Sequence, residues 1–107
     1  MLFAKVIEVN KMRKITRDAI RAFRNREKFK RGNTEVYTRS GITYLTLFEN
    51  TIALYAEGEG LLITSAGHAT TTTKERLNGL PNVHIVQKNF EWFLNGELWN
   101  GSLIKVE

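Results

Sequence analysis

The segment between Thr70 and Pro81, TTTTKERLNGLP, constrains the fold of this chain more than any other. Thr72 followed three residues later by Glu75 is typical of a capping box, in which each side chain accepts a hydrogen bond from a free backbone N–H at the start of a helix. Gly79 is placed to end that helix in the left-handed conformation, and Pro81 prevents its continuation. A helix of about two turns is stable only when it packs on other elements. The segment therefore predicts a short helix packed on a sheet.

A second, longer helix is predicted from Thr16 to a point between Lys28 and Lys30. Thr16 is a favourable N-cap, and Asp18 would lie in the first turn, near the positive end of the helix dipole. A glycine and an asparagine at positions 32 and 33 end the helix. One face of this helix is expected to be apolar and buried. The face consists of Ala19, Ile20, Ala22 and Phe23.

The remaining segments alternate between apolar and polar residues, as half-buried strands do. Strands are predicted at 2–9, 35–38, 42–48, 51–56 and 61–64, and after the short helix at 83–88, 90–94 and 98–99, with 103–106 available as a last edge strand. Asn95 and Gly96 favour a type I′ hairpin turn, which would make Trp92 and Trp99 cross-strand neighbours. The sequence therefore predicts a single α+β domain over residues 1–107, with two helices on one or two antiparallel sheets. The expected order is roughly β-α-β-β-β-β-α-β-β-β.

The chain contains no cysteine, which excludes disulfides, thiolate zinc sites and thiol nucleophiles and favours a reducing compartment. Residues 1–10 include Lys5 and Glu8 within an apolar run and do not resemble a signal peptide. No apolar run approaches the roughly 20 residues of a membrane-spanning helix. We therefore expect a soluble, cytoplasmic protein with no membrane partner.

The net charge of +5 is concentrated in one segment. Between Lys11 and Arg31 the chain has ten basic residues and two acidic ones, Asp18 and Glu27. Such a segment favours contact with a phosphate backbone, although a solvated helix face or a surface for an acidic protein has the same composition. The candidate residues for binding nucleic acid or a protein partner are Arg13, Lys14, Arg17, Arg21, Arg24, Lys28, Lys30 and Arg31.

A second candidate site lies at the start of the short helix, where hydroxyls and exposed N–H groups beside cations attract anions. A helix cap with surface threonines accounts for the same pattern, and Glu75 would compete with an anion for the N–H groups. The candidate residues of this anion site are Thr70, Thr72, Thr73, Lys74 and Arg76.

Aromatic residues supply a further candidate surface. These side chains would either stack on single-stranded bases or pack in the core and the hairpins. They are Tyr37, Tyr44, Tyr55, Phe90, Trp92, Phe93 and Trp99. Packing is favoured, because the tryptophans are spaced as hairpin neighbours.

The sequence contains little that would support catalysis. Its two histidines, His68 and His84, lie in different predicted elements, with no cysteine and no closely spaced acid to complete a metal site. Ser65 precedes His68 closely but lacks the signature of a nucleophile elbow, and no glycine-rich phosphate loop is present. We expect neither an enzyme nor a bound cofactor or metal ion.

Four motifs lie in the carboxy-terminal half: SAGHAT at 65–70, TTKERLN at 72–78, WFLNG at 92–96 and WNG at 99–101. They resemble a family of small phage- and prophage-encoded proteins of unknown function, in which a Thr-rich run leads into Lys-x-Arg-Leu-Asn and a Trp-x-Leu-Asn-Gly-x-x-Trp-x-Gly hairpin closes the chain. The resemblance departs at His68, where tryptophan is commoner, and in the density of cations on the first helix. It implies a phage context and a fold, but no chemistry.

The basic segment supports two functional hypotheses. In the first, a phage accessory protein binds DNA or RNA without catalysis through residues 11–31, with Arg17, Arg21, Arg24 and Lys28 as the main phosphate contacts. In the second, a protein-binding module inhibits or redirects a host protein, such as a defence complex or a polymerase, by using the same cations to occupy a partner's site. The oligomeric state stays open.

Overall fold

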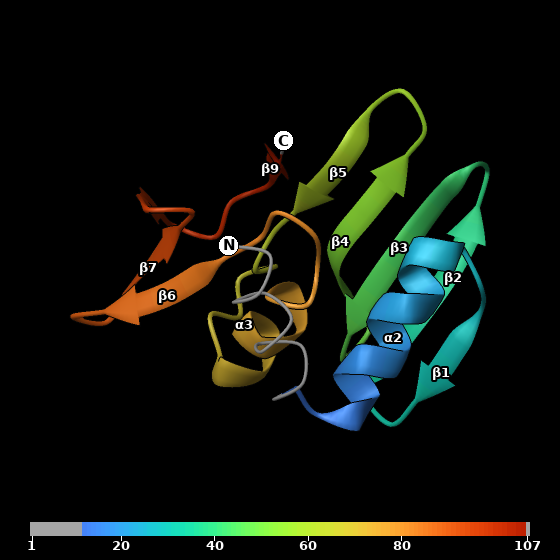
Figure 1. Cartoon of the computed structure of the whole chain (residues 1–107), viewed down its shortest axis with the longest axis horizontal. Coiled ribbons are helices and arrows are strands. Elements are labelled where there is room, and N and C mark those ends of the chain that lie inside the picture. Colours follow the sequence, from blue (N-terminus) through green and yellow to red (C-terminus); the bar gives the residue numbers. More distant parts are fainter. Residues whose placement is uncertain (1–11, 107) are drawn as a thin grey trace.

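The computed structural model of the chain describes residues 12–106. The first predicted strand, at residues 2–9, lies outside this range. The described part contains two helices and two antiparallel sheets (Figure 1). Its elements are α2 (Lys14–Asn25), β1 (Phe29–Arg31), β2 (Thr34–Arg39), β3 (Ile42–Leu47), β4 (Asn50–Ala56), β5 (Gly60–Ile63), α3 (Thr71–Leu77), β6 (Ile85–Lys88), β7 (Glu91–Leu94), β8 (Glu97–Trp99) and β9 (Ile104–Val106).

Strands β1 to β5 form an antiparallel meander, and β9 returns to pair with β5, so the larger sheet has the order β1-β2-β3-β4-β5-β9. Strands β6, β7 and β8 form a separate three-stranded sheet. Helix α2 packs on the larger sheet at β1 to β3, α3 lies beside α2 and β4, and the small sheet extends to one side (Figure 1). The predicted α+β class is confirmed, and the order of the elements agrees with the prediction from the first helix on, with β1 as an additional strand.

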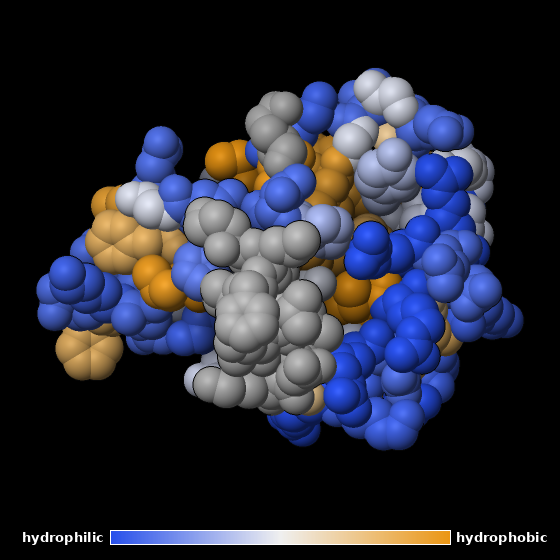
Figure 2. Space-filling view, viewed as in Figure 1, coloured by the Kyte–Doolittle hydropathy of each residue, from blue (hydrophilic) through white to orange (hydrophobic). Residues whose placement is uncertain are grey.

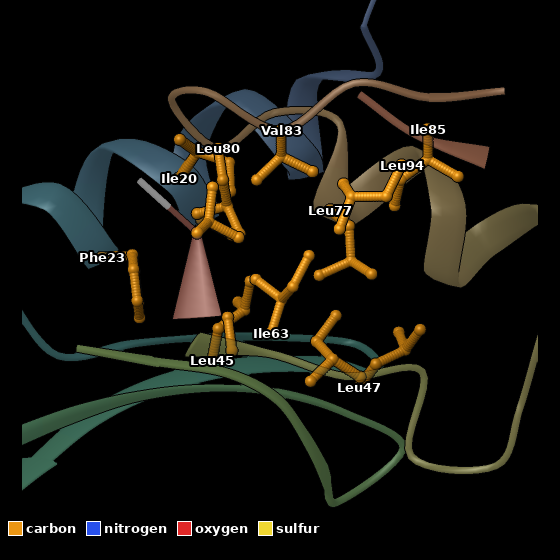
Figure 3. Close-up of a cluster of buried hydrophobic side chains, with 14 of the residues drawn as sticks. Ile20, Phe23, Leu45, Leu47, Ile63, Leu77, Leu80, Val83, Ile85 and Leu94 are labelled. Carbon is orange, nitrogen blue, oxygen red and sulfur yellow. The ribbon is translucent and has the colours of Figure 1, made fainter. Parts of the chain in front are cut away.

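The hydrophobic core lies between the two helices and the larger sheet and continues toward the small sheet (Figure 3). The apolar face predicted for the first helix is buried, and its largest members, Ile20 and Phe23, point inward from α2. Leu45 and Ile63 of the sheet meet them and are fully buried. Each such side chain stabilises the fold by roughly 1.5–3 kcal/mol relative to exposure.

The hairpin turn between β7 and β8 is determined by its own residues. Asn95 and Gly96 both have positive φ, as a type I′ turn requires, and the turn joins β7 to β8 as predicted. Trp92 and Trp99 are cross-strand partners with ring centroids 6.1 Å apart. Both indoles are buried, which confirms packing as the role of this pair.

Helix α2 is shorter than predicted and is not capped by Thr16. It ends at Asn25, where Arg26 adopts a left-handed conformation with φ of 58° and its N–H donates to the carbonyl of Phe23. Residues 29–31 then form β1, because they pair with the start of β2. Thr16 lies inside the helix and is fully buried. Lys28, Lys30 and Arg31 are therefore not part of the helix.

The predicted capping box and the left-handed Gly79 of the short helix are also wrong. The N-cap of α3 is Thr70, whose hydroxyl oxygen accepts from the N–H of Thr73 at 3.1 Å. Glu75 points instead to the start of α2. Gly79 has no positive φ, but a Cβ there would lie 2.7 Å from Cγ1 of Ile20. This glycine allows the end of α3 to approach α2 closely, which is a packing requirement that a local pattern does not reveal.

Candidate nucleic-acid interface

Three arginines of α2 line a single shallow hollow. Because Arg17, Arg21 and Arg24 recur every three or four residues, they project from the exposed side of the helix, opposite its apolar face. The hollow has a volume of about 400 Å³ and is completed by Met12, Ile20, Asn25 and Gly79. None of the residues that line it is acidic. Figure 2 shows the hydrophilic surface that covers α2.

A second group of cations surrounds Asp18. The Asp18 carboxylate accepts from Nη1 of Arg31 at 2.8 Å and from Nζ of Lys14 at 3.0 Å, and Nη1 of Arg21 lies 3.6 Å away. Hydrogen bonds from Arg31 and then from Lys14 lower the pKa of Asp18 to about 2. Lys14 and Arg31 are thus partly neutralised, whereas Arg17 and Arg24 form no ion pair within residues 12–106.

A carboxyl titration checks this arrangement. We expect the side-chain carboxyl of Asp18 to titrate near pH 2, about two units below its ordinary value of 3.8. Because the folded-state pKa is lowered, the charged carboxylate stabilises the fold above pH 4, and this contribution disappears as the pH falls from about 4 to 2. NMR of the carboxyl carbon measures the midpoint. Arg31→Ala should raise it more than Lys14→Ala does, and a midpoint near 3.8 in the unaltered protein would contradict this arrangement of cations around Asp18.

The remaining predicted cations are spread over other elements. Lys28 lies between α2 and β1 and lines a different hollow, of about 680 Å³, together with the acids Glu35 and Glu49. Lys30 lies in β1 opposite Glu35. Arg13 precedes α2 with an exposed side chain. The eight predicted residues therefore do not form one surface. Arg17, Arg21 and Arg24 share a hollow whose lining has no acidic residue, although Arg21 also pairs with Asp18.

The residues of the predicted anion site are divided between a helix cap and the interior. The hydroxyls of Thr70 and Thr73 lie 3.0 Å apart at the start of α3, and Thr73 is buried. Thr72 and Lys74 are half-buried on the helix. The guanidinium of Arg76 is fully buried and points away from this cap, toward α2 and the β1–β2 turn.

Arg76 is the centre of a polar network that no local pattern in the sequence indicates. Its Nε donates to Oγ1 of Thr34 at 3.1 Å, and its Nη1 donates to Oγ1 of Thr16 at 2.8 Å and to the carboxylate of Glu75. Glu75 also accepts from the backbone N–H of Arg13 at 3.2 Å. Burial lowers the pKa of Arg76, and the neighbouring Glu75 opposes this effect. Glu75 therefore caps α2 rather than its own helix.

A third hollow, of about 390 Å³, opens beside the end of α2. Phe23, Tyr55, Leu61 and Pro81 give it an apolar lining, and Arg24 and Arg26 also line it. The guanidinium of Arg26 lies over the Tyr55 ring, 5.1 Å from its centroid. Tyr55 was predicted from the sequence as a candidate for stacking on bases. The hollow beside it was not predicted, because it depends on the left-handed turn at Arg26, which no motif indicated.

Within residues 12–106, no group of three or more His, Cys, Asp or Glu side chains is placed to hold a metal ion. Neither of the two described helices has the length and apolar character needed to cross a membrane.

Comparisons with known proteins place the chain in a phage family. A search of curated proteins found no match, and a search of solved structures found none. The family described as Kyanoviridae Gp96 protein matches residues 12–105, which is almost the whole described part of the chain. The phage context that the resemblance implied is confirmed, while the individual motifs quoted for it stay a prediction. The chain belongs to the Kyanoviridae Gp96 protein family of phage proteins.

Proposed function

We propose that this phage protein binds nucleic acid in the host cytoplasm, without catalysing a reaction, through Arg17, Arg21 and Arg24 of α2. The observation that supports the proposal is the acid-free hollow that these arginines line. Arginine presents a fork of donors that matches the geometry of phosphate oxygens. Arg17 and Arg24 are seven positions apart, which is about 10 Å along a helix axis. The row is therefore long enough to contact more than one phosphate of a backbone.

Charge reversal on this row is the test. The variant Arg17→Glu/Arg21→Glu/Arg24→Glu should bind fluorescent DNA and RNA at least tenfold more weakly than the unaltered protein, because each lost cation removes a phosphate contact and its counterion release. The affinity of the unaltered protein should fall steeply between about 50 and 300 mM salt. Fluorescence anisotropy gives both results, and circular dichroism confirms that the variant is folded.

A matched control separates local contacts from net charge. Arg39→Glu/Lys88→Glu/Lys105→Glu makes the same change in net charge on exposed residues of β2, β6 and β9. This control should keep most of the affinity. Equal losses in both triple variants would mean that only overall charge matters, and no binding to any nucleic acid at low salt would remove the proposed function.

A second candidate function, binding of a host protein, is supported by an exposed apolar surface on the small sheet. Val86, Phe93 and Leu98 are consecutive cross-strand partners of β6, β7 and β8. Leu98 is 63% exposed, and Phe90 in the adjoining turn is 96% exposed. Exposed apolar surface of this kind is typical of protein interfaces. A complex of fixed stoichiometry with one host protein, which survives nuclease treatment and is lost in Phe90→Ser/Leu98→Ser, would support this candidate over the first.

A further inference from the structure

The hollow lined by Phe23 and Tyr55 has the size and the chemistry of a small-ligand site. Its volume of about 390 Å³ lies in the range of pockets that bind small molecules, which is about 300–1,000 Å³. Its apolar lining consists of Phe23, Tyr55, Leu61 and Pro81 together with Val106. Figure 2 shows hydrophobic atoms exposed beside the hydrophilic surface of α2. A flat aromatic ligand fits such a lining, since it gains both apolar burial and ring contacts.

This hollow shares one lining residue with the hollow that holds the arginine row. Arg24 belongs to the lining of two hollows. One is the first hollow, with Arg17 and Arg21, and the other is the apolar hollow with Tyr55. Arg26 adds a second cation, and no carboxylate pairs with it within residues 12–106. No acidic residue lines either hollow. A phosphate held by Arg24 would therefore lie next to an apolar cavity of the right size for the base attached to it.

We propose that this hollow binds one unstacked base of a single-stranded nucleic acid whose backbone follows Arg17, Arg21 and Arg24. The inference rests on the function proposed above and adds the form of the nucleic acid. The base takes the place of the Arg26 guanidinium on the Tyr55 ring, and the guanidinium turns to a phosphate. The side chain of Asn82, which also lines the hollow, supplies donors and an acceptor for the base edge. A duplex keeps its bases paired and stacked, so its bases cannot enter.

Other hollows of the described part fit a base less well. The hollow beside Tyr37 and Arg39 contains the carboxylates of Glu35 and Glu49, which repel a phosphate. In addition, the Tyr37 ring is already stacked on Tyr44 at 5.0 Å between centroids. The hollow beside Trp92 and Trp99 is lined by Glu91 and by no arginine or lysine. The apolar hollow beside α2 is the one in which aromatic rings and cations occur together without an acid.

The first experiment uses the unaltered protein with three ligands that carry the same backbone charge per strand. They are a single-stranded DNA 12-mer, the duplex of the same sequence, and a 12-mer in which every base is absent. We expect the single strand to bind at least fivefold more tightly than the abasic strand and than the duplex, because base stacking on aromatic side chains contributes to affinity only when the base is present and free. A 2-aminopurine base in the strand should lose fluorescence on binding as it stacks.

Variants of the cavity then locate the base. Tyr55→Leu keeps an apolar side chain but removes the ring, and should bring the affinity for the single strand to within about twofold of that for the abasic strand. Tyr44→Leu removes a ring that stacks on Tyr37 and does not line this hollow, and should change neither affinity. Equal affinity of the unaltered protein for all three ligands, with loss of binding in the triple charge reversal, would overturn the base site and leave the proposed function standing. No binding to any of these ligands or to a single-stranded RNA of the same sequence would remove both.

Discussion

Replacing Arg76 with methionine is expected to lower the free energy of unfolding by about 3 kcal/mol. The guanidinium is 1% exposed and donates to three hydroxyl or carboxylate partners, so its removal takes the only cation from the buried side of the Glu75 carboxylate and one donor from each of two buried hydroxyls, while the N–H of Arg13 and the hydroxyl of Thr16 still donate to Glu75. We expect a loss of free energy at the lower end of the range for breaking a buried ion pair, because the Glu75 side chain is 23% exposed and keeps part of its hydration. Urea unfolding followed by the fluorescence of Trp92 and Trp99 measures the change.

Two further variants show whether the unpaired carboxylate causes the loss. Lys74→Met removes a cation from the same helix and should cost less than about 0.5 kcal/mol, because Lys74 has no ion pair within the described residues. Glu75→Gln in the Arg76→Met background should recover part of the stability, since it removes the uncompensated charge. A loss below about 1 kcal/mol for Arg76→Met would show that the network is not important for folding.

The Arg76 network also matters for the proposed binding surface. Thr16 and the backbone N–H of Arg13 belong to the start of α2, and Thr34 and Asn33 belong to the β1–β2 hairpin. Glu75 and Arg76 of α3 therefore fix the helix that carries the arginine row relative to the larger sheet. The pattern Lys-x-Arg-Leu-Asn acquires a structural explanation, because Leu77 is fully buried and the Asn78 side chain bonds both backbone groups of Ile85 in β6.

Features of the fold that depend on neighbouring residues were predictable from the sequence. The type I′ turn at Asn95 and Gly96 requires positive φ at two adjacent positions, and these residue types adopt it at little cost. The apolar face of α2 follows from helical spacing alone. The alternation of buried and half-buried residues in β2 and in the first half of β3 likewise requires only that one face of the sheet be buried.

Features that depend on distant residues were not predictable in this way. Threonine is a common N-cap residue, which is why Thr16 was predicted to cap α2. Its hydroxyl instead forms hydrogen bonds with Glu75 and Arg76, about sixty positions away. The end of α2 is set by the pairing of Phe29 with Val36, which overrides the helical spacing of the cations. The shorter helix still carries the arginine row, because Arg17, Arg21 and Arg24 precede Asn25. Lys28 lies beyond the end of the helix and is therefore not part of the row.

Gly101 connects the C-terminal segment to the end of β5 and has no space for a side chain. Its carbonyl accepts from the N–H of Ser65 at 2.8 Å and from Oγ1 of Thr64 at 2.9 Å. Its φ is +90°, and an added Cβ would lie 2.9 Å from Cβ of Ser65 and would overlap the Ser65 hydroxyl. The backbone approach at this point thus requires glycine for two separate reasons, conformation and contact.

Gly101→Ala is therefore expected to lower the free energy of unfolding by about 3 kcal/mol, as the positive φ and the collision with Ser65 each contribute. Gly58→Ala is a matched control, because Gly58 has φ of +88° with open space around it and should lose only about 1 kcal/mol. Ser65→Gly removes both colliding atoms, so Gly101→Ala should cost about as much as the Gly58 control in that background. If Gly101→Ala cost the same with and without the Ser65 side chain, conformation alone would explain the requirement for glycine, and the contact would contribute nothing.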